Sequence, residues 1–414
     1  MWLLDTSTIE LHDFIDSQVP PYTILSHTWE DEEVLHHELR ESPLAVRHKK
    51  GFSKVVKFCE ISKSRGYQWA WQDNCCIDKR SSAELSEAIN SMFHYYREAE
   101  ECLIYLSDVP SVADVGMRRQ LQLTQMRDCR WFTRGWTLQE LIAPQSRVLF
   151  DAHWSPIDDG EDLVDTLASI TKIYPELLRN RDLLSTFCVA ERMSWASQRQ
   201  TTRAEDRAYS LMGLFNIHMP VLYGEGAQKA FRRLQEEIIR ISFDQSIYVW
   251  QGSYKSSGLL AKSPSDFAET PRLGLWAPVS LAPSMMTNVG LSIRMNVTEV
   301  KSEDASWLKD DYRPEEMDYL AVVACDVWNG TSWVLLVLHL QQIPNAGFYV
   351  NGRRCKAFRR VHCNTYQKVF VDSVKGRFGS GSSTDILVLE DEHYELVGLA
   401  LDDDSVRANG LSFS

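Results

Sequence analysis

The sequence predicts an α/β fold, with a parallel sheet covered by helices on both faces, followed by a helical segment and a β-rich C-terminal domain. Short apolar runs alternate with helical patterns in the first part, apolar residues recur at helical spacing in the second, and polar and apolar residues alternate in the third. We therefore expect an α/β core over residues 1–155, a helical completion over 156–250 and a β-sandwich or barrel-like domain over 251–414.

The first two strands of the core are separated by a helix. The β-rich run from Tyr22 to Ser26 predicts a strand that ends in a polar loop. Apolar residues from Phe52 to Cys59 recur at helical spacing, and Gly66 supplies a C-terminal stop. The apolar run from Trp69 to Trp71 then predicts the next strand.

A second helix leads to two further strands. A capping box at Ser81 precedes an apolar helical face that runs from Leu85 to Ala99. Cys102 to Leu106 predicts the third strand, and the short segment Trp136 to Leu141 precedes a fourth strand at Arg147 to Phe150. The predicted order is therefore β-α-β-α-β-α-β.

Polar loops follow three of these strands, and they lie at Ser26 to Asp31, Asp73 to Lys79 and Ser107 to Asp108. Parallel sheets with right-handed crossovers bind ligands beyond the carboxyl ends of their strands, so we expect a site there. The candidate substrate-binding residues in these loops are Ser26, His27, Trp29, Asp73 and Asp78. The alternative for the two aspartates is that they cap the next helix.

The rest of the chain gives two simpler patterns. One helical stripe is interpreted as core, and its members are Ala227, Ala230, Phe231, Leu234, Ile238 and Ile241. Further along, Leu291 to Val297 alternates as a strand does, and Asn329-Gly330 and Asn351-Gly352 are two-residue hairpin signals.

Charge and cysteine usage favour a cytoplasmic protein that does not bind nucleic acid. The formal net charge is -13, and the dense basic cluster between Arg353 and Arg360 is interpreted as solvated strand faces. The nine cysteines show neither disulfide nor metal-ligand spacing, which favours reduced thiols and no metal site. Met1 to Glu10 lacks the features of a signal peptide, and no apolar run approaches the roughly 20 residues that span a bilayer.

Common catalytic signatures are missing from the sequence. It contains no GxxxxGK[ST] phosphate loop, no HExxH motif and no GxSxG elbow. Gly224-Glu225-Gly226 opens a helix but lacks the third glycine of a dinucleotide loop, so a plain helix-start turn is favoured over phosphate binding. Cys75 and Cys76 are interpreted as small buried residues, because no base is placed beside them.

Trp136 and Glu140 form a pair that suggests a pocket. They are four residues apart and would share one helix face, so an indole ring and a carboxylate could line the same cavity. The alternative is that Trp136 belongs to the core and that Glu140 pairs with Arg134 or Arg130.

Three stretches resemble the signature blocks of fungal heterokaryon-incompatibility (HET) domains, and they are Tyr22 to Trp29, Gln72 to Lys79 and Arg134 to Leu141. The likeness continues through Thr201 to Ser210 and Leu222 to Gly226, so it covers about the first 250 residues. The remaining part resembles the less specific β-rich extension of the same proteins.

HET domains are in turn thought to be distant relatives of Toll/interleukin-receptor (TIR) domains, so the resemblance implies a TIR-like, flavodoxin-like sheet. Trp136 to Leu141 is similar to the WCLxEL segment that carries the catalytic glutamate of TIR enzymes, which implies that Glu140 is catalytic. Thr137 replaces the usual cysteine. The implied substrate-binding residues are Ser26, His27, Trp29, Asp73, Asp78 and Trp136.

The function that the resemblance implies is an NAD glycohydrolase of fungal self/non-self recognition and programmed cell death. NAD would be the substrate, no cofactor would be needed, and self-association would be required for activity. Two alternatives remain open at this point: a non-catalytic signalling or interaction module, and a HET-like fold recruited as a biosynthetic enzyme for another small molecule.

Overall fold

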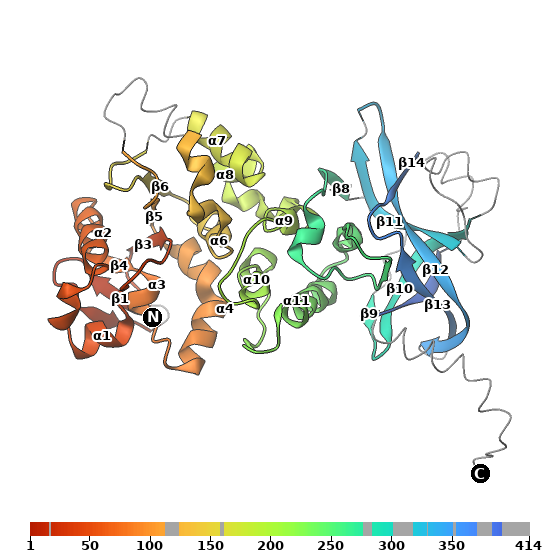
Figure 1. Cartoon of the computed structure of the whole chain (residues 1–414), viewed down its shortest axis with the longest axis horizontal. Coiled ribbons are helices and arrows are strands. Elements are labelled where there is room, and N and C mark those ends of the chain that lie inside the picture. The colour runs from red at the N-terminus through yellow and green to blue at the C-terminus, as the bar shows by residue number, and fades with distance from the viewer. Residues whose placement is uncertain are drawn as a thin grey trace, which may run out of the picture. The chain divides into compact units, whose positions relative to one another are not determined.

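The chain is organised as two compact units (Figure 1). The computed structural model describes residues 1–15, 18–111, 124–157, 161–275, 284–300, 318–328, 330–350, 353–370 and 383–390. Unit 1 comprises Met1–Thr186 and Gln198–Ala230, and unit 2 comprises Phe187–Ser197 and Phe231–Ser414. The chain thus enters unit 2 for a short segment, returns to unit 1 and then enters unit 2 again.

A mixed sheet organises unit 1. Its strands among the described residues are β1 (Trp2–Asp5), β2 (Leu11–Asp13), β3 (Tyr22–His27), β4 (Trp69–Trp71), β5 (Glu101–Tyr105) and β6 (Arg147–Phe150). Their spatial order is β2-β1-β4-β3-β5-β6. β4, β3, β5 and β6 are parallel neighbours, whereas β1 is antiparallel to both β2 and β4. The four strands predicted from the sequence are therefore confirmed.

The antiparallel edge of this sheet corrects the expectation of a purely parallel one. The sequence predicts no strand before Tyr22, yet β1 buries Leu3 and Leu4 completely and pairs Asp5 with Trp69 of β4. The apolar run of β1 is short, so its pattern alone does not distinguish a strand from a buried turn. Every residue of β3 is buried, because this strand has a neighbour on each side and lies in the centre of the sheet.

Helices connect and follow these strands in unit 1. The α-helices are α1 (His36–Glu41), α2 (Phe52–Ser64), α3 (Asp73–Cys76), α4 (Ser82–Glu98), α6 (Thr137–Ile142), α7 (Glu161–Thr171), α8 (Pro175–Arg179) and α10 (Asp206–Tyr209). Short 3-10 turns are η2 (Ala45–His48), η3 (Met126–Asp128), η4 (Arg130–Thr133), η5 (Arg181–Thr186) and η6 (Met212–Phe215).

The predicted ends of two helices are confirmed. After α2, Gly66 has a φ of +93°, a left-handed conformation that glycine adopts without strain. At the start of α4, the Ser81 side chain accepts a hydrogen bond from the Glu84 backbone N–H at 3.3 Å. The crossover helices α2 and α4 are thus set by local sequence signals.

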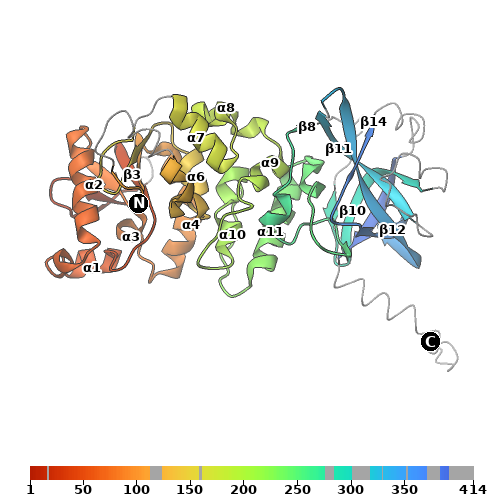
Figure 2. The same cartoon turned by 45° about the horizontal axis from the view of Figure 1, so that its top comes forward.

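Unit 2 contains the helices α9 (Val189–Ser194) and most of α11 (Ala227–Ile241), with the 3-10 turns η7 (Gln245–Tyr248) and η8 (Pro264–Phe267). Its strands are β7 (Ser256–Ser257), β8 (Leu273–Leu275), β9 (Met285–Met286), β10 (Gly290–Glu299), β11 (Asp318–Trp328), β12 (Trp333–Val350), β13 (Arg353–Val361), β14 (Gln367–Phe370) and β15 (Ser383–Leu389). Figure 2 gives a second view of these strands.

The longer strands of unit 2 close on themselves. The path runs β12-β11-β10-β15-β13, and β13 pairs again with β12. The prediction of a β-rich, barrel-like part is therefore confirmed. Leu291, Ile293 and Met295 of β10 are buried as the alternating pattern predicts.

Hairpins and charges in unit 2 refine the expectations. β12 and β13 pair up to Val350 and Arg353, on either side of Asn351-Gly352, which lies outside the described residues, as does Asn329 of the other hairpin signal. The basic cluster is not a continuous solvated face, because Arg360 is completely buried. Its guanidinium donates to the backbone carbonyls of Tyr248 at 3.0 Å and Trp250 at 2.6 Å.

One residue of the predicted core stripe on α11 is exposed. Ala230, Phe231, Leu234 and Ile238 are buried, whereas Ile241 is 61% exposed at the last turn of the helix. In the part of the chain that the structure describes, no helix is long and apolar enough to cross a bilayer.

Candidate functional site

Glu140 is a buried carboxylate held by a directed chain of hydrogen bonds. It lies on α6 and is 6% exposed. The Trp131 indole Nε1–H donates to Ser26 Oγ at 2.8 Å, and Ser26 Oγ donates to Glu140 Oε2 at 2.5 Å. An indole nitrogen can only donate, so the single hydroxyl proton of Ser26 is left to point at Glu140. Oε2 is therefore an acceptor in this arrangement.

Burial changes the charge of Glu140 near neutral pH. Loss of solvation raises its pKa to about 7 from the ordinary 4.5, and this effect outweighs the nearby Arg134 charge and the Ser26 hydrogen bond, which both lower the pKa. The carboxyl group thus takes up and releases a proton in the physiological range. Such a group suits acid–base or electrostatic catalysis.

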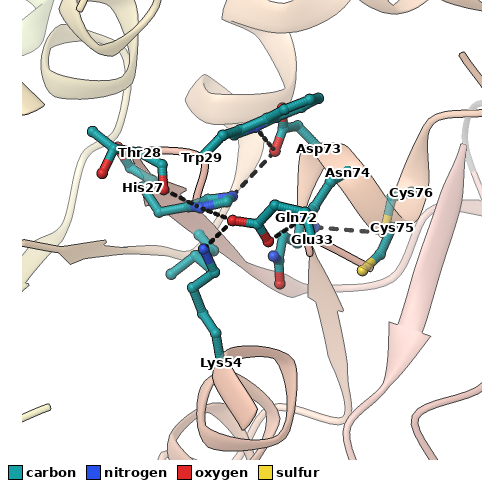
Figure 3. A network of polar contacts seen from close by, with 12 residues as sticks. His27, Thr28, Trp29, Glu33, Lys54, Gln72, Asp73, Asn74, Cys75 and Cys76 are labelled. Carbon is teal, nitrogen blue, oxygen red and sulfur yellow. Dashed lines mark hydrogen bonds and ion pairs between the residues drawn. The ribbon is translucent and has the colours of Figure 1, made fainter. Parts of the chain in front are cut away.

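Asp73 lies at the start of α3 and collects donors from the loop after β3 (Figure 3). Trp29 Nε1–H donates to both carboxylate oxygens, at 3.0 Å and 3.2 Å. The His27 Nε2 lies 3.2 Å from Oδ1, and the Lys79 ammonium lies 3.5 Å from Oδ2. Burial alone would raise the pKa of Asp73, but the Lys79 charge, the hydrogen bond with His27 and the Arg134 charge hold it well below its usual range. Asp73 is therefore a permanent negative charge.

Two cationic side chains lie close to the ring of Trp29. The Lys79 ammonium lies 3.4 Å from the centroid of its ring, and the Arg134 guanidinium lies 5.8 Å from it. Arg134 also donates to the His27 backbone carbonyl at 3.0 Å. The indole is 38% exposed, so part of it remains available to a ligand.

These groups line one cavity of about 610 Å³, within the range typical of small-molecule sites. Its wall includes the candidate residues Trp29, Asp73, Trp136 and Glu140, together with Arg203 and Tyr223. Both members of the predicted aromatic and carboxylate pair therefore border the same space, and Glu140 is not an exposed ion-pair partner of an arginine.

Hydrogen bonds to Asp206 organise another part of the same cavity wall. Asp206 accepts from the Trp136 indole N–H at 3.0 Å and from the Tyr223 hydroxyl at 3.0 Å. The Arg203 guanidinium lies 3.9 Å from the centroid of the Tyr223 ring. Burial raises the pKa of Asp206, while the two hydrogen bonds oppose that rise. The hydrogen bond from its indole N–H to Asp206 thus anchors Trp136 in the cavity wall.

The remaining candidate residues lie outside the cavity wall. Ser26 and His27 are buried behind Glu140 and Asp73, to which they are hydrogen bonded. Asp78 is directed elsewhere: it accepts from Arg80 at 3.1 Å and lies 3.7 Å from His36. The strong Arg80 contact lowers the pKa of Asp78 to about 2. The substrate-binding roles of all these residues stay predictions.

Sequence reasoning missed two buried residues that support the site. Trp131 is completely buried and starts the hydrogen-bond chain to Glu140. Arg199 is 5% exposed and donates to Thr137 Oγ1 at 2.8 Å and to the Arg134 backbone carbonyl at 2.9 Å, which fixes the start of α6. Burial lowers the pKa of Arg199 to about 10. Neither contact is visible in the sequence, because the partners of Trp131 and Arg199 lie 105 and 62 residues away.

Two other sequence features have structural roles. Glu205 Oε1 accepts from the backbone N–H groups of Gly224 at 2.9 Å and Gly226 at 3.0 Å, so a carboxylate of the chain occupies the place that a phosphate would need. Cys75 and Cys76 are buried, and burial raises the pKa of both thiols. Both observations agree with the non-catalytic interpretations.

Comparison with known proteins adds two family matches and one relative. Residues 22–122 match the heterokaryon incompatibility protein (HET) family, and residues 229–284 match a domain of unknown function, DUF8212. Over 229 residues the chain is 45% identical to Vegetative incompatibility protein HET-E-1 of Podospora anserina. The match covers 55% of this chain but only 17% of that relative. No solved structure matches the chain.

Proposed function

The chain carries a heterokaryon-incompatibility domain, and we propose that this domain is a TIR-like NAD glycohydrolase that acts in self/non-self recognition and cell death. The named relative is a vegetative incompatibility protein, which supports the pathway. The substrate would be NAD, the reaction would be hydrolysis of its N-glycosidic bond, and Glu140 would be the catalytic group.

The observation that carries this proposal is the state of Glu140 in its cavity. The carboxyl group borders a space of about 610 Å³, is 6% exposed and has a pKa raised by burial to about 7. A carboxylate that is itself shielded from water interacts strongly with charge that develops on a substrate. Trp29 and Trp136 border the same cavity. The Lys79 ammonium already lies over one face of Trp29, so a planar ring would stack on Trp136 or on the remaining face of Trp29.

The chemistry needs one carboxylate. In NAD the nicotinamide leaves as a neutral molecule from a cationic ring, so its departure does not need the acid partner of ordinary glycosidases. Ionised Glu140 would stabilise the oxocarbenium-like ribose, and water would then add to that carbon and release a proton. Ser26 and Trp131 would hold Glu140 Oε2 in place and so keep its charge directed at the ribose.

The arrangement of strands and the local motif support the TIR-like part of the proposal. The parallel strands have the spatial order β4-β3-β5-β6, which is second-first-third-fourth along the chain, as in flavodoxin-like sheets. Glu140 lies on α6 directly before the last of these strands. Trp136 to Leu141 resembles the segment that carries the TIR glutamate.

The decisive experiment is incubation of the purified protein with NAD, with nicotinamide release followed by chromatography. The assay is run at low and high protein concentration, with and without a crowding agent, so that activity that requires self-association is also detected. Glu140→Gln should reduce the rate by about 100- to 1000-fold, because the amide keeps the shape but removes the negative charge. Glu60→Gln is the matched control, since Glu60 is an exposed carboxylate on α2.

Two outcomes would overturn the proposal. Normal turnover by folded Glu140→Gln would remove the catalytic role from this residue. A wild-type protein that is inert toward NAD in every assembly state would instead favour a non-catalytic signalling module or a biosynthetic enzyme with another substrate.

A further inference from the structure

A second cavity, of about 870 Å³, lies beside the first in unit 1. The loop after β3, the start of α2 and the loops after β5 and β6 supply its wall. Trp29 and Arg130 border both cavities, so the two spaces are neighbours. The function proposed for Glu140 makes no use of this second cavity.

The wall of the second cavity gathers basic side chains in a chain that is acidic overall. Its wall carries four basic side chains, Lys50, Lys54, Lys57 and Arg130, against the two acidic side chains of Glu30 and Asp31. The whole chain has a formal net charge of -13. Cations gathered in one wall can bind an anionic ligand where carboxylates of the chain do not already neutralise them.

The basic groups differ in how firmly they are already paired. Lys54 is buried and forms an ion pair with Glu33, and Arg130 lies 3.3 Å from Asp108. Lys57 has only an exposed contact with Glu60 at 3.3 Å, a kind of pair that contributes little. The Lys50 ammonium has no hydrogen bond or ion pair with the residues that the structure describes. Lys50 and Lys57 are therefore the cations most available to phosphate.

An aromatic wall stands in the same cavity. The rings of Tyr105 and Trp154 are stacked, with centroids 4.2 Å apart and an angle of 9° between their planes. The Tyr105 hydroxyl donates to the Ala152 backbone carbonyl at 3.1 Å, so its hydrogen bond is satisfied within the protein. An aromatic surface in the same cavity wall as the ammonium groups of Lys50 and Lys57 suits a nucleobase joined to phosphate.

One buried network supports the walls of both cavities (Figure 3). Glu33 accepts from Lys54 of the second cavity, from the Glu30 backbone N–H at 2.9 Å and from Asn74 Nδ2 at 2.8 Å. Asn74 directly follows Asp73, which borders the first cavity. The shared network therefore links the wall of one cavity to the wall of the other. A ligand that occupies both cavities would need such a link, because it must contact both walls at once.

We propose that the second cavity binds the adenosine-diphosphate part of NAD, so that one dinucleotide lies across both cavities with its diphosphate beside Arg130 and Trp29. This proposal rests on the proposed function, in which the nicotinamide ribose lies at Glu140. Lys50 and Lys57 hold phosphate oxygens, and the Trp154 side of the cavity receives the adenine.

The test compares NAD with nicotinamide riboside, which lacks both the diphosphate and the adenosine. The double variant Lys50→Ala/Lys57→Ala should raise the KM for NAD about tenfold, because two ammonium–phosphate contacts are lost, and should change the KM for nicotinamide riboside by less than twofold. Lys63→Ala is the matched control, since Lys63 is an exposed lysine of α2 that borders neither cavity. Equal changes in KM for both substrates, or no change for NAD, would overturn the proposal.

Direct binding of ADP separates this proposal from the proposed function. Titration calorimetry should show that wild type and Glu140→Gln bind ADP alike, and that the double variant binds it about tenfold more weakly. If wild type binds ADP in this way but never releases nicotinamide, the cavity assignment stands and the glycohydrolase proposal fails. If wild type does not bind ADP at millimolar concentration, or if Arg203→Ala rather than the double variant weakens binding, the second cavity is not the adenylate site.

Discussion

Glu140→Gln is predicted to stabilise unit 1 at alkaline pH. The pKa of Glu140 is about 7 in the folded chain against an ordinary 4.5, because burial penalises the carboxylate. The folded protein therefore holds a proton between these pH values that the unfolded chain has released. Stability is lost as the pH rises through this window, and the loss is complete above pH 7. The difference of 7 minus 4.5, about 2.5 pH units, corresponds to about 3 kcal/mol.

The substitution removes this cost without breaking the local hydrogen bonds. The amide oxygen of glutamine can still accept from Ser26 Oγ, so the hydrogen bonds from Trp131 to Ser26 and from Ser26 to residue 140 are both kept. The neutral side chain no longer charges above pH 7. Wild type and Glu140→Gln should thus differ little near pH 5, whereas the variant should gain about 3 kcal/mol at pH 8.5.

Urea unfolding followed by tryptophan fluorescence at pH 5, 6, 7 and 8.5 measures this effect. Glu60→Gln, at a carboxylate that is 60% exposed, should show no comparable pH dependence. A Glu140→Gln protein that is less stable than wild type at pH 8.5 would refute the reasoning. So would a stability difference that does not change with pH, because the carboxylate would then have partners that compensate its burial.

Three further outcomes are expected. Ser26→Ala removes a hydrogen bond that lowers the pKa of Glu140, so the rise of NAD cleavage with pH should move to higher pH, and an unchanged pH–rate profile would contradict this. Gly213→Ala should lower the free energy of unfolding by about 1 to 3 kcal/mol, because the added Cβ would lie 2.1 Å from the Phe93 Cβ. Urea unfolding measures this, and an unaltered urea midpoint would show that Phe93 moves aside freely. The nine cysteines are free and buried, so a thiol-labelling reagent should react slowly with the native protein and should reach all nine thiols quickly in denaturant. Rapid labelling of the native protein would mean that the buried thiols become accessible.

The predictability of the fold depended on how local each signal was. The strands β3, β4, β5 and β6 could be predicted because each is an apolar run between helix signals or turn residues. β1 could not, because its burial depends on pairing with β4, more than 60 residues along the chain. Ile241 looked like core from its spacing, yet it lies at the end of α11 where the helix has no cover on that side.

The candidate site shows the same limit. Trp136 and Glu140 could be related from the sequence because four residues on a helix define a shared face. Trp131 could not be assigned to the site, because its hydrogen bond to Ser26 crosses 105 residues. Asp78 looked equivalent to Asp73 in sequence, but its carboxylate forms an ion pair with the neighbouring Arg80 and does not border the cavity.

The interleaved path of the chain through its two units has a consequence for synthesis on the ribosome. The first backbone N–H groups of α9 donate to side chains further along the chain, from Val189 to Asp244 at 2.7 Å and from Ala190 to Ser246 at 3.0 Å. The partner of Val189 is made 55 residues later, which takes roughly 3 to 11 s at about 5–20 residues per second. During that interval the nascent α9 lacks its side-chain acceptors and these groups bond to water, although residues 198–230 can already join unit 1. A chain released at residue 243 would lack both side-chain caps of this helix, so the native start of α9 depends on translation continuing through Ser246.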